Sequence, residues 1–424
     1  MTGFQTQTPP GTASNDVIVT VRIASTGGRT RASWIEGSDV HMPSSLLDRT
    51  GWRRAIRSNG ELDVPPEPAP ISGRDIIELR ERRAFIERRP LSARLPINYR
   101  IVPGWARAAA ASAIGWWHRG RAERWAAFPG WPIDLSVDAL DDLRDEPDEP
   151  ASHRDGRPDR ETSAARHSPT AVVLTHDIDS AEGLTNLLSR FLPLEEALGA
   201  RSTNYIVPCA YPVDHGLVGE LVARGHHVGV HGYDHSHRTP FTDAGDRVRR
   251  LDAARLFATR YRALGYRAPS LLRTRALVRD LATRYQYDSS IPTSGGLFPA
   301  PNNGCATARP FLVEGIVELP VTLPRDGTLR FLGCSPPEIA QTWIDCAETI
   351  SRARGVVVLL THCERRFSGA DPMFVAYRQF LEYVRGRPDR FAFSTPADVI
   401  GRARQPPLPR APAGRDAITR APAN

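Results

Sequence analysis

The sequence is poor in cysteine and has no long apolar run, and each absence excludes a class of protein. Its 424 residues include five cysteines, an odd number, and no Cys-x-x-Cys pair. We therefore expect reduced thiols rather than a disulfide framework or a zinc ribbon. No apolar run approaches the roughly 18 residues that predict a membrane-spanning helix. The first 15 residues also lack the basic and apolar segments of a signal peptide, so we expect a cytoplasmic location.

The excess of basic residues is small and is spread along the chain. There are 55 lysines and arginines against 48 acidic residues, for a net charge of +7. This balance does not indicate a nucleic-acid partner, although a mildly basic face is compatible with an anionic lipid surface or a phosphate-bearing substrate. Hydrophobic residues at 41% and charged residues at 24% are typical of a soluble globular protein.

Composition divides the chain into five parts. Residues 143–169 have almost no apolar side chains, so they cannot bury enough surface to fold. The end of the chain is rich in Pro, Ala and Arg and is predicted to be disordered as well. The predicted organisation is a disordered lead (1–15), an N-terminal appendage of mixed structure rich in Trp and Arg (16–142), a disordered linker (143–169), a catalytic domain (170–404) and a disordered tail (405–424).

The appendage contains a cluster of tryptophans with two interpretations. Five of the eight tryptophans lie between Trp105 and Trp131, interleaved with arginines. A basic helix that carries tryptophans can lie on a membrane surface, which would give a peripheral contact at the inner membrane face. Alternatively, the tryptophans pack onto the main domain. The sequence PGWP at 129–132 is typical of a packed corner and favours the second interpretation.

Residues 170–404 alternate between strand-like and helical patterns. A repeated β-α pattern implies an α/β fold with a parallel sheet or barrel, whose ligand site lies at the carboxyl ends of the strands. Strands are predicted at 171–175, 203–207, 227–231, 316–319, 356–360 and 391–393, helices at 181–198, 215–224, 244–263, 273–284, 337–353, 371–386 and 396–403, and a long loop at 291–313; in the appendage a strand is predicted at 16–24 and a helix at 73–89.

Two aspartates end the most apolar of these strands. Residues 171–179 read AVVLTHDID, with Asp177 and Asp179 at the end. Their side chains point the same way if the strand continues through them and diverge if the chain turns. One interpretation is an Asp pair that caps the next helix. The other is a ligand site at the carboxyl end of a parallel strand.

Two histidines follow another strand at a spacing that suits a metal. His231 and His235 share a face if this segment forms a helical turn. Two imidazoles and one carboxylate from elsewhere make a three-ligand site with a position open to water. The alternative is a pair of buried, hydrogen-bonded histidines. We favour the metal interpretation here, and we expect His176, His227 and His237 to be structural or to support the ligands.

Three further groups lie at predicted strand ends. Arg267 could hold a neighbouring carboxylate in its ionised form, because an adjacent positive charge lowers the pKa of a carboxyl. Asp288 follows a short strand-like segment, and His362 ends the apolar run VVVLLTH at 356–362. Each feature alone is weak, since a surface arginine and a histidine that caps a loop are common.

Together, and in this order, these motifs resemble those of the polysaccharide deacetylase family (carbohydrate esterase family four, the NodB-homology domain) over residues 170–404. The resemblance implies a distorted (β/α) barrel and a hydrolase of carbon–nitrogen bonds other than peptide bonds. It implies these roles: Asp177 is the catalytic base, Arg267 pairs with that base, His362 is the catalytic acid, Asp288 supports His362, and Asp179, His231 and His235 bind the metal.

The sequence departs from the commoner family pattern at two positions. Ile178 separates the aspartates, as in family members with an Asp-x-Asp motif. Gly232 replaces the usual Ser or Thr after the first metal histidine, which removes a hydrogen bond from that loop.

The resemblance implies N-deacetylation of an acetamido sugar, in a soluble, lipid-linked or polymeric saccharide. A His₂Asp set suits Zn²⁺, and Co²⁺, Ni²⁺ or Mn²⁺ could substitute. Because the reaction needs a charged His362 and an ionised Asp177 at once, a bell-shaped pH–rate profile is predicted. Two alternatives remain open: a deformylase or cyclic amide or imide hydrolase of the same fold, and a non-catalytic carbohydrate-binding protein.

Overall fold

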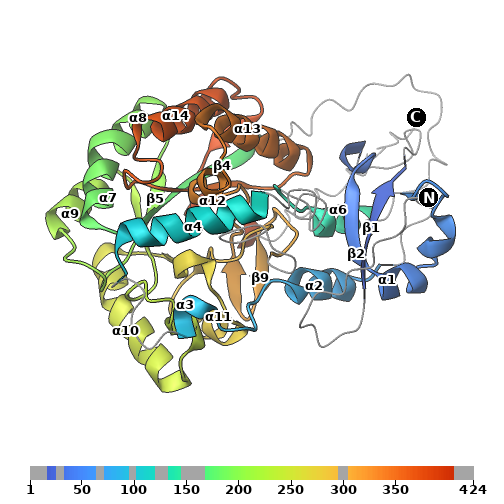
Figure 1. Ribbon diagram of the computed structural model, residues 1–424, viewed down its shortest axis with the longest axis horizontal. Coiled ribbons are helices and arrows are strands. Elements are labelled where there is room, and N and C mark those ends of the chain that lie inside the picture. Colours follow the sequence, from blue (N-terminus) through green and yellow to red (C-terminus); the bar gives the residue numbers. More distant parts are fainter. Residues whose placement is uncertain are drawn as a thin grey trace, which may run out of the picture.

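The computed structural model describes residues 17–24, 33–63, 71–94, 102–119, 132–144, 168–294 and 304–404 (Figure 1). The predicted disordered lead and tail, and nearly all of the predicted linker, lie outside these residues, as do Trp125 and Trp131. Within the described part of the chain, no helix is both long and apolar enough to span a membrane. All five cysteines are described, and none of them forms a disulfide.

A curled sheet of nine strands forms the centre of the larger part of the molecule. All of its pairings are parallel except the one between β9 and β10. The two sides of the sheet approach each other, because the amide of Leu323, just beyond β10, donates to the carbonyl of Val358 on β11 at 3.1 Å. The predicted fold class, an α/β fold with a distorted barrel, is confirmed. In sheet order the strands are β11 (Val357–His362), β4 (Thr170–Ile178), β5 (Ser202–Ile206), β6 (His227–Val230), β7 (Gly265–Tyr266), β8 (Tyr287–Asp288), β10 (Ile316–Glu318) and β9 (Phe311–Val313), with β12 (Phe391–Phe393) also paired to β4.

Helices pack around this sheet where amphipathic patterns predict them (Figure 1). The predicted helix at 181–198 is present but contains a π-helical turn at Leu187–Phe191. Strand β4 is longer than predicted and is buried from Val172 to Ile178, so it lies in the core. The helices are α7 (Ala181–Asn186), α8 (Leu192–Ala197), α9 (His215–Ala223), α10 (Ala244–Tyr261), α11 (Arg275–Leu281), α12 (Asp326–Phe331), α13 (Pro336–Arg352), α14 (Asp371–Arg385) and α15 (Pro396–Arg404).

The N-terminal part forms a small three-stranded sheet with its own apolar core. The helix predicted at 73–89 is shorter than expected, because it ends at Arg82. Beyond it, the buried guanidinium of Arg83 binds Asp134 at 3.1 Å, and the amide of Ile86 donates to the carbonyl of Arg273 at 2.9 Å. Bonds to the rest of the protein therefore replace the expected helical turns. The elements are β1 (Ile18–Ile23), β2 (Asp39–Pro43), β3 (Glu61–Leu62), α1 (Ser44–Arg49), α2 (Gly73–Arg82), α3 (Leu91–Arg94), α4 (Gly104–Arg119) and α6 (Ser136–Arg144).

Helix α4 belongs to the N-terminal part but lies alongside α12 of the larger part (Figure 1). Gly115 makes this close approach possible, because a Cβ atom there would lie 2.0 Å from the carbonyl oxygen of Phe331. The prediction that the tryptophans pack onto the main domain is wrong for α4. Trp105 and Trp116 are each 77% exposed, since the helix packs through its small residues instead.

Candidate active site

The polar side chains of interest lie at the carboxyl ends of neighbouring parallel strands. On β4, Asp177 is in register with Tyr205 of β5 on one side and with His362 of β11 on the other. His231 directly follows β6, and Arg267 directly follows β7. Parallel pairing thus brings these groups, which are far apart in the sequence, to one edge of the sheet.

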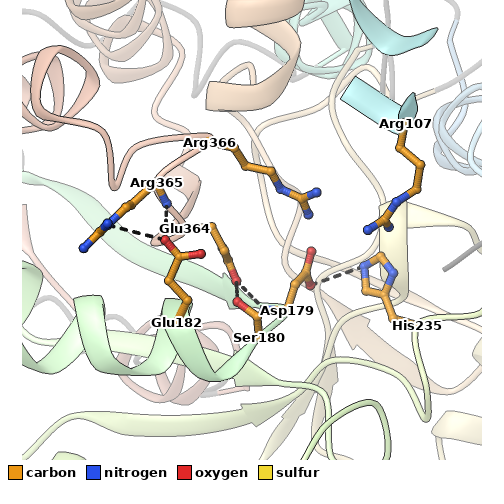
Figure 2. A pocket seen from close by; sticks show the side chains of 8 residues that line it. All are labelled: Arg107, Asp179, Ser180, Glu182, His235, Glu364, Arg365 and Arg366. Atoms are coloured by element: carbon orange, nitrogen blue, oxygen red, sulfur yellow. Dashed lines mark hydrogen bonds and ion pairs between the residues drawn. The ribbon is translucent and has the colours of Figure 1, made fainter. Parts of the chain in front are cut away.

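A pocket of about 420 Å³ opens at this edge (Figure 2). Asp179 and His235 form part of its wall, and Glu364 lies beside them. The Oε1 atom of Glu364 accepts from the Asp179 amide at 3.0 Å and from the Ser180 hydroxyl at 2.9 Å. These bonds hold the chain just after β4. The lining residues are Arg107, Asp179, Ser180, Glu182, His235, Glu364, Arg365 and Arg366.

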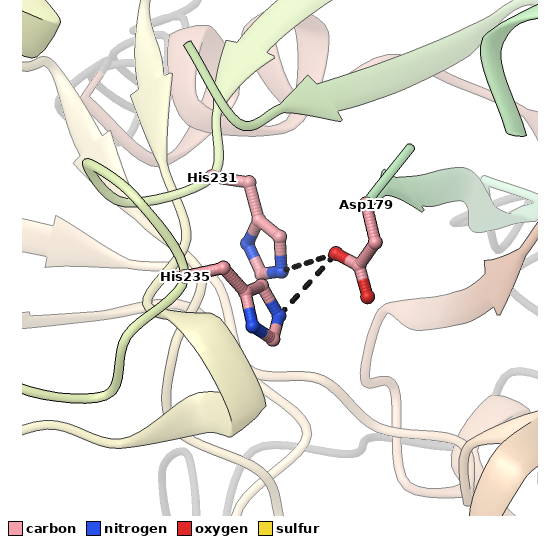
Figure 3. Close-up of side chains that lie close together, drawn as sticks. All are labelled: Asp179, His231 and His235. Atoms are coloured by element: carbon pink, nitrogen blue, oxygen red, sulfur yellow. Dashed lines mark ion pairs between the residues drawn. The ribbon is translucent and has the colours of Figure 1, made fainter. Parts of the chain in front are cut away.

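Asp179, His231 and His235 converge on one point (Figure 3). The Oδ1 atom of Asp179 lies 3.6 Å from Nε2 of His231 and 3.3 Å from Nε2 of His235. Burial alone would raise the pKa of Asp179, but the two histidines lower it below its usual range. The predicted alternative that the aspartates cap the next helix is wrong, because Ser180 is the N-cap of α7.

The condition of a helical turn is not met, because His231 and His235 lie in a loop. Gly232 and His235 both have left-handed backbone conformations, with φ of 69° and 56°. A Cβ atom on Gly232 would also lie 2.5 Å from Cδ of Pro269. Glycine is therefore required at 232 both by its φ and by this close approach. Left-handed turns, rather than a helix, fold His235 back beside His231.

The three residues fit a divalent metal ion. The Nδ1 atom of His231 donates to the carbonyl of Arg267 at 3.0 Å, so Nε2 is the ring nitrogen that faces Asp179 and is placed to bind a metal. The Oδ1 atom of Asp179 is buried and accepts no hydrogen bond from the described residues. Ligand atoms about 2.1 Å from a tetrahedral metal lie about 3.4 Å apart, close to the separations observed here.

Asp177 is held beside this group by a buried arginine. Arg267 donates from Nη1 to Oδ1 of Asp177 at 3.1 Å and to Oγ1 of Thr175 at 2.9 Å. Its other donors bind the carbonyl and hydroxyl of Ser289, both at 2.9 Å. The other oxygen of Asp177, Oδ2, lies 3.4 Å from Nε2 of His231. One oxygen is thus fixed by a permanent cation, and the other faces the candidate metal position.

His362 is bonded to Asp326 rather than to Asp288, which corrects the sequence prediction. Its Nδ1 atom lies 2.8 Å from Oδ1 of Asp326, and its amide donates to Oδ2 at 2.8 Å. Burial would lower the pKa of His362, but the charge and hydrogen bond of Asp326 raise it to about 9. The imidazole is therefore protonated at neutral pH and can act as an acid.

Asp288 lies elsewhere in the core because β8 pairs with β10. It is in register with Glu318, and its Oδ1 atom accepts from the hydroxyl of Ser290 at 2.6 Å. Burial raises the pKa of Asp288 to about 6, and burial together with Asp288 raises the pKa of Glu318 well above its usual value. Asp326 was not among the predicted site residues: it lies seven residues beyond the strand predicted at 316–319, at the first position of α12, so no strand-end pattern marks it.

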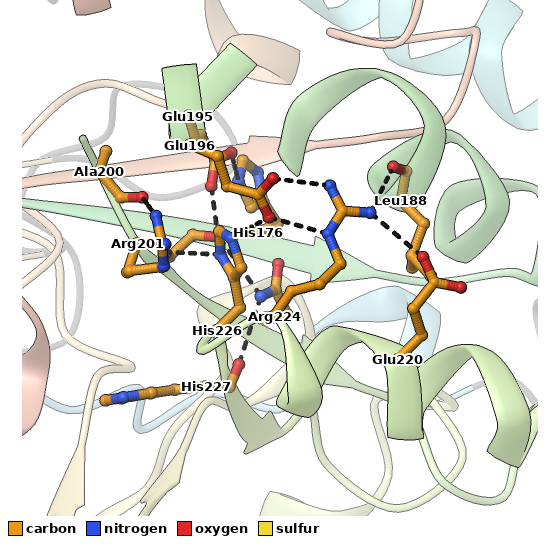
Figure 4. Close-up of polar contacts among 12 residues, drawn as sticks. His176, Leu188, Glu195, Glu196, Ala200, Arg201, Glu220, Arg224, His226 and His227 are labelled. Atoms are coloured by element: carbon orange, nitrogen blue, oxygen red, sulfur yellow. Dashed lines mark hydrogen bonds and ion pairs between the residues drawn. The ribbon is translucent and has the colours of Figure 1, made fainter. Parts of the chain in front are cut away.

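The remaining histidines that were considered are structural. His237 bonds the hydroxyls of Ser92 and Ser270 at 3.0 and 2.8 Å. His176 is fully buried and bonds Oε1 of Glu195 at 2.8 Å, whereas the ring of His227 lies apart from this network (Figure 4). These arrangements agree with the expected structural or supporting roles.

Glu195 is the centre of that network, and we expect its loss to destabilise the fold. Its Oε1 atom also accepts from the Tyr377 hydroxyl at 2.9 Å. Its Oε2 atom lies 3.6 Å from Nδ1 of His226 (Figure 4). Glu195→Ala should lower the free energy of unfolding by about 3–5 kcal/mol, because it leaves buried polar groups uncompensated. Glu196→Ala, which removes an ion pair with Arg224 nearer the surface, should cost less than about 1 kcal/mol. Urea unfolding measures both, and equal losses would contradict the assignment.

The chain is similar to several solved structures, at low sequence identity. No protein-family model and no curated protein matches the chain. A protein from Mycobacterium smegmatis assigned as a polysaccharide deacetylase is 18% identical over 58% of this chain and 96% of its own, with a TM-score of 0.44. Puue allantoinase is 16% identical over 60% and 96%, with a TM-score of 0.42. A family 4 carbohydrate esterase from Streptomyces lividans is 16% identical over 53% and 92%, with a TM-score of 0.34. Values this low do not carry the activity of these proteins over to this chain.

Proposed function

We propose that this protein is a metal-dependent amide hydrolase that removes the acetyl group from an acetamido sugar. One observation supports the proposal: three side chains that could hold a metal ion lie at the same sheet edge as a carboxylate bonded to arginine and a histidine bonded to aspartate. A base, an acid and an electrophile at one edge of the sheet are the groups that hydrolysis of an unactivated amide needs. A binding protein would need none of these three.

In the proposed reaction, Asp177 and His362 move the protons. Asp177 accepts a proton from the water that attacks the amide carbonyl, and Arg267 keeps its carboxylate oriented. His362 donates a proton to the nitrogen that leaves as the amine, and Asp326 holds the imidazole in position. The products are a carboxylic acid and a free amine.

Asp179, His231 and His235 would hold the metal. The ion, when bound, supplies a Lewis acid that polarises the carbonyl and makes water more acidic. The His₂Asp set suits zinc, and cobalt, nickel or manganese could replace it.

Metal content and acetate release together test this function. Zinc-loaded wild type should retain about one metal ion per chain and release acetate from N-acetylglucosamine oligomers. His235→Ala should lose both properties because it removes a ligand. His237→Ala is the matched control, since His237 is two residues away and bonds the hydroxyls of Ser92 and Ser270. It should keep the metal.

The possible outcomes separate the alternatives. One outcome is a wild type that binds metal but releases no acetate. If it instead releases formate or opens a cyclic amide, the substrate is a different amide from the one proposed. A wild type that does not bind zinc, cobalt, nickel or manganese would contradict the proposal.

A further inference from the structure

The pocket beside the candidate metal group has a wall that is rich in arginine. Arg107 comes from α4, whereas Arg365 and Arg366 come from the segment that follows β11. In Figure 2 the guanidinium groups of Arg107 and Arg366 extend toward the space beside Asp179 and His235. The same two groups approach one point on α4, because a Cβ atom on Gly104 would lie 3.9 Å from Nη2 of Arg107 and 4.0 Å from Nη1 of Arg366.

Arg365 and Arg366 differ in what they bind. Arg365 has a side chain that is 82% exposed and lies 3.7 Å from Glu182, away from Asp179 (Figure 2). The guanidinium of Arg366 lies 4.9 Å from the centre of the Phe367 ring. Within the described ranges, no hydrogen bond or ion pair is found for Arg366, and its Nε atom is buried. Arg366 therefore has donors that are available to a ligand.

The neighbouring acids face other groups, although Oδ1 of Asp179 and Oε2 of Glu364 accept no hydrogen bond from the described residues. Oε1 of Glu364 accepts from the chain after β4, Glu182 faces Arg365, and Asp179 faces His231 and His235. If Asp179 binds a metal ion, Arg366 stands beside another cation, which is unfavourable unless an anion joins them.

A second buried arginine, Arg325, also has guanidinium donors without hydrogen-bond acceptors among the described residues. Arg325 is only 6% exposed, and its Nε and Nη2 atoms have no hydrogen-bond partner in the described part of the chain. It precedes Asp326, whose oxygens are occupied by His362 and Ser368. Buried guanidinium donors without acceptors are costly; Arg325 adds positive charge behind Asp326 but does not line the pocket.

We propose that Arg366 and Arg107 form a subsite for an anionic group of the substrate, a carboxylate or a phosphate, next to the scissile amide. The inference rests on the proposed hydrolase function and narrows it, because the substrate becomes an acidic acetamido sugar rather than a neutral one. It also gives a role to the N-terminal part, which supplies Arg107 through the close packing of α4 at Gly115.

Anion binding can be measured without catalysis. Inorganic sulfate, a dianion that does not precipitate zinc, would be titrated into the zinc-loaded full-length protein by calorimetry. Arg366→Gln should weaken sulfate binding at least about tenfold, since a charge-assisted contact is lost. Arg365→Gln removes the same charge one residue away and should bind sulfate as the wild type does. Equal affinities in all three proteins, or no sulfate binding by the wild type, would overturn the proposal.

Kinetics identify the anion. N-acetylglucosamine, N-acetylglucosamine 6-phosphate and N-acetylmuramic acid present no anion, a phosphate and a carboxylate. The wild type should prefer one acidic sugar, and Arg366→Gln should raise the KM for that sugar about tenfold with a smaller change in kcat. A preference for the neutral sugar would overturn the subsite. If no sugar is hydrolysed, the proposed function fails, and the sulfate titration still decides whether the anion subsite exists.

Discussion

Asp177→Asn is expected to reduce amide hydrolysis by about 10²–10⁴-fold, the contribution of a general base, while leaving the metal in place. Asparagine keeps the size of the side chain, and its carbonyl oxygen can still accept from Nη1 of Arg267, now at 3.1 Å from Oδ1. It cannot take a proton from water at neutral pH. The three proposed ligands, Asp179, His231 and His235, are untouched.

Asp179→Asn is the matched control, and it should lose the metal as well as the activity. The comparison decides which aspartate is the ligand, because Oδ2 of Asp177 lies 3.4 Å from Nε2 of His231 and Oδ1 of Asp179 lies 3.6 Å from the same atom. Elemental analysis and acetate release would be measured on both variants. If Asp177→Asn loses the metal and Asp179→Asn keeps it, the two roles are exchanged.

Asp326→Asn is expected to move the alkaline limb of the pH–rate profile to lower pH. Asp326 is the group that raises the pKa of His362 to about 9 against the effect of burial. An acid must carry its proton, so activity should persist up to about pH 9 in the wild type and fall as the pH rises further. Without the carboxylate, the pKa of His362 should return toward 6.5 or below. At pH 8 the protonated fraction, and with it kcat/KM, should then fall about thirtyfold.

The control removes a hydroxyl group that donates a hydrogen bond to the same carboxylate. Ser368 donates to Oδ2 of Asp326 at 2.8 Å, and Ser368→Ala removes this bond without changing any charge. Its alkaline limb should stay near that of the wild type. An Asp326→Asn profile that keeps its alkaline limb while losing kcat evenly at all pH values would contradict the role of His362 as the acid.

The sequence by itself determined the order of elements in the larger part of the chain and most of the residues at the site. The reason is that a buried strand is an apolar run and an amphipathic helix has its own period, and both patterns are local. Because parallel strands end at one edge of a sheet, Asp177, His231, Arg267 and His362 could be expected to meet there. The register of β4 with β11 places Asp177 beside His362.

Only the tertiary structure decided which distant groups touch within that edge. Asp288 is the last residue of β8 and pairs in register with Glu318 in the core, whereas Asp326 begins α12 beyond the end of β10. The segment after β10 bonds β11 through Leu323 and so carries Asp326 to His362. This choice depends on how far the sheet curls, which is a property of the whole barrel and leaves no local pattern in the sequence.

Tertiary packing also decided the conformation of the loop that carries His231 and His235, and it decided which residues line the pocket. The left-handed conformation at Gly232 goes with its close packing against Pro269, and His235 is left-handed as well, so the two histidines are not brought together by helical spacing. Arg107 reaches the pocket because α4 docks on α12 at Gly115. The sequence supplied the residue types that catalyse, whereas the packing of one part of the chain on another decided which of them face the substrate.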